Sequence, residues 1–316
     1  MDRDHSIDVY RGIAIAGMVF FTLTLRLSSN LPEFLRHNMW GSIHIGDFIL
    51  PMFLFASGLS LSYYINQKEL SSKNQYIYSI FFRLIKLVSV GICLSFFSAY
   101  GFLEMDEVML SAILFILCLA LSKFNWKTNL GLIFIIFISY VVLVQLDMIN
   151  IFYGHYLGGY PAALYYLPVM LVGLQVGKAT IKENILCPSN KTIMWTIFLL
   201  FLISMIFIAL DKMTVTPSFI YLSILCCFIF FVFVRLLLTK YVSLKTFAYM
   251  GQNPLRFWIM MYVFFLIPMW FYNEIFSLSN PLIMHWVLSA IVSAFILLLL
   301  YMLSRLYEHI SYVIMK

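Results

Sequence analysis

The chain has 316 residues, of which 63% are hydrophobic and only 11% are charged. Soluble domains carry about 25% charged residues, so this composition excludes a soluble globular protein and indicates a polytopic membrane protein. The net charge of +6 comes from residues scattered over short loops. Charges in such loops fix the orientation of a membrane protein, and nucleic-acid binding is not expected.

Segments long enough to cross a membrane follow one another along the whole sequence. A helix needs about 20 apolar residues to cross the bilayer, and the sequence offers about ten such segments. We predict them at 9–28, 44–65, 76–99, 107–122, 129–147, 160–178, 192–210, 217–238, 247–272 and 282–304. The fourth is short, and Asn253-Pro254 interrupts the ninth. Because the loops leave no room for a soluble domain, we expect an all-α helix bundle that forms a single integral-membrane domain over residues 1–316.

The lysines and arginines of the predicted loops are distributed unequally. One set of alternate loops, with both termini, holds most of them: Arg3, Lys68, Lys73, Lys123, Lys127, Lys178, Lys182, Lys191, Lys240, Lys245 and Lys316. The other set is mainly acidic: Glu33, Glu104, Asp106, Glu107, Asp147, Asp211 and Glu274. Cytoplasmic loops carry the excess of Lys and Arg. We therefore predict that both termini lie in the cytoplasm and that the loop around His37 lies on the outer side. The Asn-, Ile- and Lys-rich composition further predicts a plasma-membrane protein.

The first predicted span opens with a charged pair, Asp8 and Arg11, which i,i+3 spacing places on one helical face. A charge within hydrocarbon costs about 2.5–3.5 kcal/mol on insertion scales, so such residues need a partner or a function. Two interpretations stay open: a local ion pair at the membrane edge, or an arginine whose guanidinium binds a phosphate.

A polar loop with His37 leads into the second span, which contains His44 and Asp47. A histidine at the membrane edge titrates near neutral pH and can act as a base, although a solvated loop residue is the simpler interpretation of His37 taken alone. A carboxylate that accepts a hydrogen bond from an imidazole fixes its tautomer and raises its basicity. Asp47 could serve either histidine. We favour a functional role for Asp47, because an uncompensated carboxylate there would be costly.

Basic residues recur in the cytoplasmic halves of later spans. Arg83 and Lys86 lie three residues apart in the third span, and Arg256 lies in the ninth. Snorkelling toward the headgroups explains Arg83 and Lys86 taken alone. Together with Arg11, these residues would form a basic mouth suited to an anionic, phosphate-rich ligand from the cytoplasm.

The ninth span contains the sequence Gly251-Gln252-Asn253-Pro254. Proline frees backbone carbonyls within a helix, and the asparagine adds a polar amide. A helix break at membrane depth is expected to line a cavity or to pack inside the protein, so we place Asn253 with the residues that bind the anionic ligand.

Other sequence features are less specific. The segments 153–166 and 211–219 are polar parts of predicted outer loops, and they fit either the rim of a binding site or an interfacial aromatic belt. No His/Cys cluster has the spacing of metal ligands, so no metal is expected. No GxSxG elbow, phosphate-binding glycine loop or dinucleotide fingerprint occurs.

The beginning of the chain resembles a known family. The segment HSIDVYRGIAIAGMVF at 5–20 is similar to the S-[LV]-D-x-[FY]-R-G opening of transmembrane acyltransferases related to heparan-α-glucosaminide N-acetyltransferase. The similarity continues without a gap through H-x-x-W, with His37 and Trp40, and through D-x-x-x-P-x-F-x-F-x-x-G from Asp47 to Gly58. Weaker similarities follow at 167–177, 212–219 and 250–255.

Two positions depart from the family pattern. Thr22 is the nearest equivalent of an asparagine that helps catalysis in the family, and the family's L-Q-R motif is not evident around 108–113.

The resemblance implies an enzyme that transfers an acetyl group from cytoplasmic acetyl-CoA, as co-substrate, to a sugar amine or hydroxyl on the outer side of the lipid bilayer. His37 would be the general base or a transient acyl carrier, with Asp47 and Thr22 as further catalytic residues. The residues expected to bind the CoA are Arg11, Arg83, Lys86, Asn253 and Arg256.

A transporter or a lipid or glycolipid flippase that uses Asp47 and the Pro254 break is the alternative function, since transporters also contain buried ionisable residues and broken helices. Against it, we find no inverted repeat and no second broken helix in a matching position. A scaffolding protein would leave Asp47 unexplained. The sequence leaves open the identity of the sugar or glycan acceptor, the choice between N- and O-acylation, and homo-oligomer formation.

Overall fold

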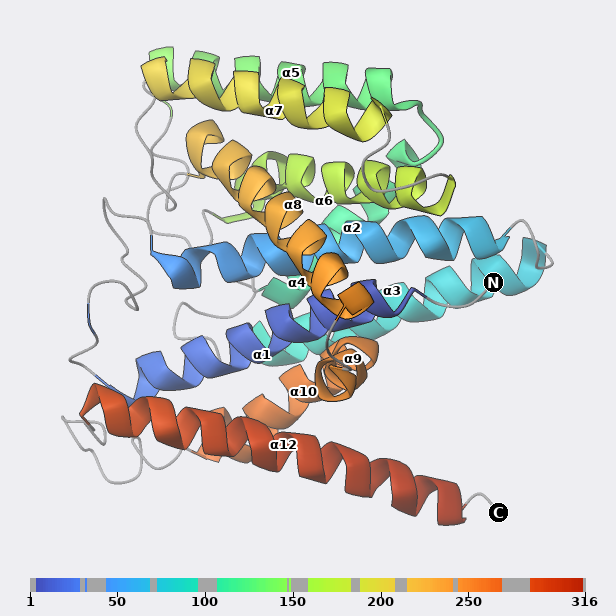
Figure 1. Cartoon of the computed structure of the whole chain (residues 1–316), viewed down its shortest axis with the longest axis vertical. Helices are drawn as coiled ribbons and strands as arrows, with labels where there is room; N and C mark the ends of the chain where they lie inside the picture. The colour runs from blue at the N-terminus through green and yellow to red at the C-terminus, as the bar shows by residue number, and fades with distance from the viewer. Residues whose placement is uncertain are drawn as a thin grey trace. The chain divides into compact units, whose positions relative to one another are not determined.

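A computed structural model describes residues 4–28, 32, 44–68, 73–95, 107–146, 148, 159–182, 188–207, 215–240, 244–268 and 285–314. Its regular structure within these ranges is helical throughout, as the sequence predicts (Figure 1). The helices are α1 (His5–Leu27), η2 (Ile45–Phe48), α2 (Ile49–Lys68), α3 (Lys73–Ser95), α4 (Glu107–Leu121), α5 (Trp126–Gln145), α6 (Gly159–Lys182), α7 (Pro188–Phe207), α8 (Pro217–Lys240), α9 (Lys245–Gln252), α10 (Pro254–Met261), η5 (Tyr262–Leu266) and α12 (Trp286–Ile314).

Each predicted span coincides with one of these helices or with a consecutive set of them. Among the described residues, six stretches are long and apolar enough to cross a membrane: His5–Leu25, Ile45–Asn66, Trp126–Gln145, Pro161–Ile181, Pro217–Leu238 and Trp286–Tyr312. Shorter apolar helices cover Glu107–Leu121, Asn190–Ile206 and Pro254–Leu266. The count of about ten crossings and the cytoplasmic position of the termini stay predictions.

Local sequence explains where several helices begin. The Asp4 carboxylate accepts a hydrogen bond from the Ser6 backbone N–H at 2.9 Å and caps α1. Asn125 caps α5 in the same way, by accepting the N–H of Thr128 at 2.8 Å. Pro254 occupies the start of α10, where its missing N–H costs nothing and its fixed φ suits the first turn. The predicted break of the ninth span at Asn253-Pro254 is confirmed.

The chain forms two compact units. We call one the terminal unit: it contains α1, η2, the end of α8, and α9, α10, η5 and α12. The other, which we call the central unit, contains α3 to α7 and most of α2 and α8.

Within the central unit, α6 packs against α4, α5 and α7. It also approaches α2 closely, because small residues stand where the two backbones meet. A Cβ added at Gly58 would overlap the Met170 carbonyl oxygen, and one added at Gly173 would overlap the Phe55 carbonyl oxygen. Small residues at helix crossings are the usual means by which membrane helices pack closely.

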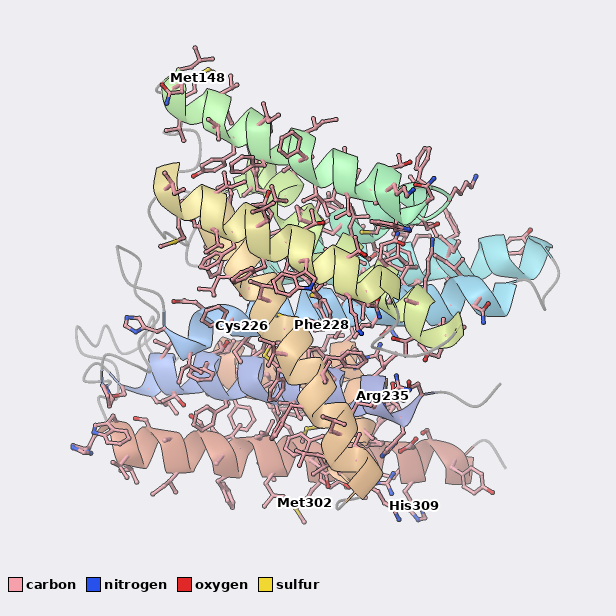
Figure 2. The ribbon with its side chains drawn as sticks, turned by 45° about the horizontal axis from the view of Figure 1, so that its top comes forward. Met148, Cys226, Phe228, Arg235, Met302 and His309 are labelled. Atoms are coloured by element: carbon pink, nitrogen blue, oxygen red, sulfur yellow. The ribbon has the colours of Figure 1, made fainter. Side chains whose placement is uncertain are left out.

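Within the terminal unit, α1 packs against α9, α10 and α12. The helices α1 and α12 run antiparallel: Thr24 Oγ1 donates to Ser293 Oγ at 2.9 Å, and Ser289 Oγ donates to the Leu27 carbonyl at 3.2 Å. The faces of α12 that do not contact α1 carry exposed side chains, among them Met302 and His309 (Figure 2). The buried faces of α1 therefore bring residues from the start of the chain against residues from its end.

Candidate functional site

Asp47 lies in η2, a short helix that packs against α1. Its side chain is buried, and Oδ2 accepts the backbone N–H of His44 at 2.9 Å. Gly46 permits the close approach of η2, because an added Cβ would lie 3.2 Å from the ring of Phe21. The carboxylate thus stabilises the first turn of η2 and is held against α1.

Thr22, the second predicted catalytic residue in the described chain, follows Phe21 on α1 and is half-buried. The contact between Phe21 and Gly46 brings the stretch of α1 that contains Thr22 next to the turn that contains Asp47. His37 lies outside the described residues, as do 153–158 and 211–214 of the two outer segments. The catalytic roles of all three side chains stay predictions.

Asp8 and Arg11 form the local ion pair that their spacing allows, with Arg11 Nη2 at 3.2 Å from Asp8 Oδ1. Both are buried, and both also bond to the end of α9. Arg11 Nε donates to the Gly251 carbonyl, and Gln252 Nε2 donates to Asp8 Oδ2 at 3.1 Å.

Glycines make this contact between α1 and α9 possible. A Cβ on Gly12 would overlap the Phe247 carbonyl oxygen, and one on Gly251 would overlap the Asp8 carbonyl oxygen. We call Asp8, Arg11, Gly12, Gly251 and Gln252 the α1–α9 junction. It joins two motifs that lie 240 residues apart in the sequence.

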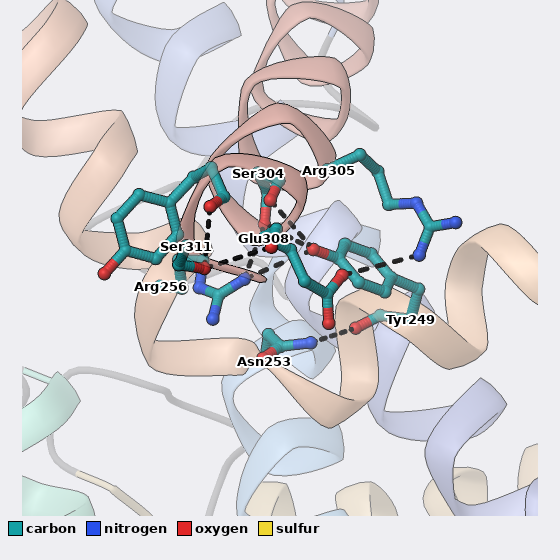
Figure 3. A network of polar contacts seen from close by, with 8 residues as sticks. Tyr249, Asn253, Arg256, Ser304, Arg305, Glu308 and Ser311 are labelled. Atoms are coloured by element: carbon teal, nitrogen blue, oxygen red, sulfur yellow. Dashed lines mark hydrogen bonds and ion pairs between the residues drawn. The ribbon is translucent and has the colours of Figure 1, made fainter. Parts of the chain in front are cut away.

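Asn253 separates α9 from α10, and its Nδ2 donates to the Tyr249 carbonyl at 3.2 Å. Arg256 follows on α10 and is half-buried. Its Nη1 donates to Tyr249 Oη at 3.2 Å and to Ser304 Oγ at 3.4 Å, and its guanidinium lies 5.1 Å from the ring centroid of Tyr307. Figure 3 shows this network between α9, α10 and α12.

A second arginine completes the network. Arg305 lies 4.8 Å from the ring centroid of Tyr249 and 3.5 Å from Glu308 Oε2 (Figure 3). We call Tyr249, Arg256, Ser304, Arg305 and Tyr307 the arginine cluster. The sequence pattern singled out only Arg256 of these five, because sequence spacing does not show how α12 packs against α9 and α10.

The remaining predicted CoA-binding residues, Arg83 and Lys86, belong to the central unit. Arg83 is half-buried, with its guanidinium 5.0 Å from the ring centroid of Phe115 and 5.9 Å from that of Tyr64. Lys86 is exposed. Over the described residues, no group of three or more His, Cys, Asp or Glu side chains is placed to hold a metal ion.

The helices and their composition are those of a polytopic helical membrane protein, and its terminal unit contains a buried ion pair between Asp8 and Arg11. The sequence model of the family described as heparan-alpha-glucosaminide N-acetyltransferase, catalytic, matches residues 3–192, which is more than half of the chain. The chain therefore belongs to this family of acetyltransferase catalytic domains. A search of curated proteins finds no match.

Proposed function

We propose that the chain transfers an acetyl group from acetyl-CoA at the cytoplasmic face to an amine or hydroxyl of a sugar at the outer face. The observation that carries this proposal is the family match over residues 3–192. The matched range spans His37 and the motif from Asp47 to Gly58. The family match does not favour the alternative function of a transporter or flippase.

His37 acts as general base in this proposal. Its neutral imidazole takes the proton of the acceptor amine or hydroxyl as that group attacks the thioester carbonyl carbon. The carbon–sulfur bond breaks, and the departing thiolate takes a proton from the imidazolium. In the alternative route, the imidazole nitrogen attacks the thioester first, releases the thiol, and passes the acetyl group to the acceptor in a second step.

Asp47 and Thr22 support this chemistry. A carboxylate that accepts the second imidazole N–H holds the ring in the reactive tautomer and stabilises the imidazolium. The Thr22 hydroxyl, as the nearest equivalent of the family's asparagine, can donate a hydrogen bond to the oxyanion that forms on the thioester carbonyl. The burial of Asp47 and the packing of its turn against α1 support this assignment.

Arg11, Arg83, Lys86, Asn253 and Arg256 remain the proposed CoA-binding residues. Their environments differ, because Arg11 is buried in an internal ion pair whereas Arg256 is half-buried among neutral oxygens. Phosphates bind best to guanidinium groups with unused donors. Arg256 is therefore the member of this set best placed to bind a phosphate directly, whereas Arg11 supports CoA binding indirectly, by positioning α9.

The test is turnover of acetyl-CoA by the purified chain, measured as thiol release with glucosamine and related sugars. We expect sugar-dependent release by the wild type and a loss of at least about a hundredfold in His37→Ala, the usual contribution of a general base. His309→Ala, which removes an exposed histidine, is the matched control and should retain activity. Equal turnover by both variants would refute the role of His37, and no turnover by the wild type with any sugar would refute the proposed function.

The pH dependence provides a second readout. A general base works only in its neutral form, so activity should rise as the pH increases through the neutral range where histidine loses its proton. An activity that falls over this range would exclude His37 as the base.

A further inference from the structure

The terminal unit contains four arginines whose side chains are described, and they differ in one respect. Three have a carboxylate oxygen within 4.0 Å: Arg11 with Asp8, Arg235 with Asp4, and Arg305 with Glu308. Arg256 has no carboxylate partner among the described residues. A half-buried charge without a counter-charge is costly, so the unpaired charge of Arg256 indicates that an anion from outside the chain neutralises it.

The bonds of Arg256 leave part of its guanidinium unused. Nη1 donates to two neutral oxygens, those of Tyr249 and Ser304. Within the described chain, no residue accepts a hydrogen bond from Nε or Nη2. These two nitrogens form one edge of the planar fork, the edge that commonly binds two oxygens of a phosphate or carboxylate at once.

The neighbours of Arg256 hold it in place without neutralising it. Tyr249 Oη donates to the Ser304 carbonyl at 3.0 Å, which fixes the hydroxyl that accepts from Arg256. The Tyr307 ring lies against the guanidinium, and such stacking restrains the plane of the group. Arg256 is thus preorganised with one edge open.

Arg305 adds a second positive charge at the same tyrosine. Its guanidinium lies over the Tyr249 ring, while Arg256 bonds to the hydroxyl of that ring. The side chain of Arg305 is 57% exposed, and its pairing with Glu308 at 3.5 Å is a surface interaction that can rearrange. Two guanidinium groups close to one side chain suit a ligand with more than one anionic oxygen.

We propose that Arg256 and Arg305 bind a phosphate-bearing anion, with Tyr249, Ser304 and Tyr307 as positioning residues for Arg256. The anion has two chemical sources: the nucleotide phosphates of the co-substrate, an assignment that rests on the proposed function, or the headgroup of an anionic phospholipid. Ser304, Arg305 and Tyr307 lie beyond residue 192, so the family match does not define this site.

The first experiment requires no variant. The full chain in neutral phosphatidylcholine vesicles is treated with phenylglyoxal, which modifies arginines, and modification of Arg256 is measured by mass spectrometry. Protection by 3′,5′-ADP, the nucleotide end of CoA, would identify the nucleotide source. Protection that appears only in vesicles containing phosphatidylglycerol would identify the lipid source. Protection by neither 3′,5′-ADP nor phosphatidylglycerol overturns the proposal.

The second experiment measures affinity for the protecting anion. Arg256→Gln should weaken binding about tenfold or more, because it removes two charge-assisted hydrogen bonds, and Arg256→Lys should fall between it and the wild type. Arg305→Gln should weaken binding by about threefold, as expected for an exposed charge. Lys127→Gln removes a charge from the central unit and should leave binding unchanged. Equal effects of Lys127→Gln and Arg256→Gln would overturn the proposal.

The outcome is separable from that of the proposed function. If the wild type transfers acetyl groups but Arg256→Gln changes neither phosphate binding nor the Michaelis constant for acetyl-CoA, this site is refuted and the enzyme stands. If phosphate binding depends on Arg256 but no acetyl transfer occurs, the site stands and the enzyme is refuted.

Discussion

The α1–α9 junction and the arginine cluster use the same type of side chain in opposite ways. At the junction, Arg11 is buried, its charge is balanced by Asp8, and its Nε bonds to the Gly251 carbonyl. In the cluster, Arg256 is half-buried and bonds only to neutral oxygens among the described residues. The presence of an arginine therefore does not by itself indicate ligand binding. An arginine whose charge is paired and whose donors are used has a structural role, and one with an unpaired charge and unused donors can bind an anion.

The two regions share the short helix α9. Gly251 and Gln252 contact α1, and Tyr249 contacts α12 through Ser304. The junction therefore fixes the helix whose tyrosine positions Arg256. Changes at the junction should affect stability first, whereas changes in the cluster should affect anion binding first.

The largest effect is expected for Gly251→Ala. The added Cβ would overlap the Asp8 carbonyl oxygen, and no rotamer change relieves a clash with backbone. Separating α1 from α9 would also break the Arg11–Gly251 bond. We expect a loss of about 5 kcal/mol or more, which is comparable to the whole stability of many domains, measured as the yield of monodisperse protein and its melting temperature.

Gly131→Ala is the matched control, because nothing lies within 4 Å of a Cβ at that position. Alanine is favoured over glycine in a helix interior by about 0.5–1 kcal/mol, so the control should be neutral or slightly stabilising. A Gly251→Ala protein as stable as the control would show that the close approach of α1 and α9 is wrong.

A smaller loss is expected for Asp8→Asn. Removing one partner leaves the Arg11 charge buried without compensation, and such changes cost about 3–5 kcal/mol. Arg11→Met should also destabilise, and the double variant should lose less than the sum of the two, since it removes both charges. Thermal unfolding in detergent, followed by tryptophan fluorescence, measures all three. Strict additivity would contradict the buried pair.

The helices were predictable because apolar length alone specifies a membrane helix, and Asn253-Pro254 specifies a break. Their ends were less predictable. The last span is predicted to end at 304, yet α12 continues to Ile314. The stretch of α12 that is apolar enough to cross a membrane runs to Tyr312, because isolated charged side chains such as Arg305 and Glu308 do not end a long apolar helix.

The candidate site was predictable only where its contacts are local. The i,i+3 spacing of Asp8 and Arg11 indicates their pairing, which the structure has. No spacing relates Arg11 to Gly251, or Arg256 to Ser304, because these contacts depend on how distant helices pack. For the same reason, the sequence predicts five residues as CoA ligands without showing which of them can bind a phosphate directly. The burial and the hydrogen bonds of Arg11 and Arg256 distinguish these two.

The smallest effect in this comparison is expected for Glu308→Gln. Its ion pair with Arg305 is exposed, with side chains 57% and 51% accessible for Arg305 and Glu308, so its loss should change stability by less than about 1 kcal/mol. The substitution removes the carboxylate that pairs with Arg305 and frees the Arg305 guanidinium for the ligand. Affinity for the protecting anion should therefore rise about two- to threefold at low salt, and the gain should shrink at high salt, where exposed charges are screened. Titration of wild type and variant at two ionic strengths measures this. Weaker anion binding in the variant would contradict an anion site at the arginine cluster, because a neighbouring carboxylate can only oppose such a ligand.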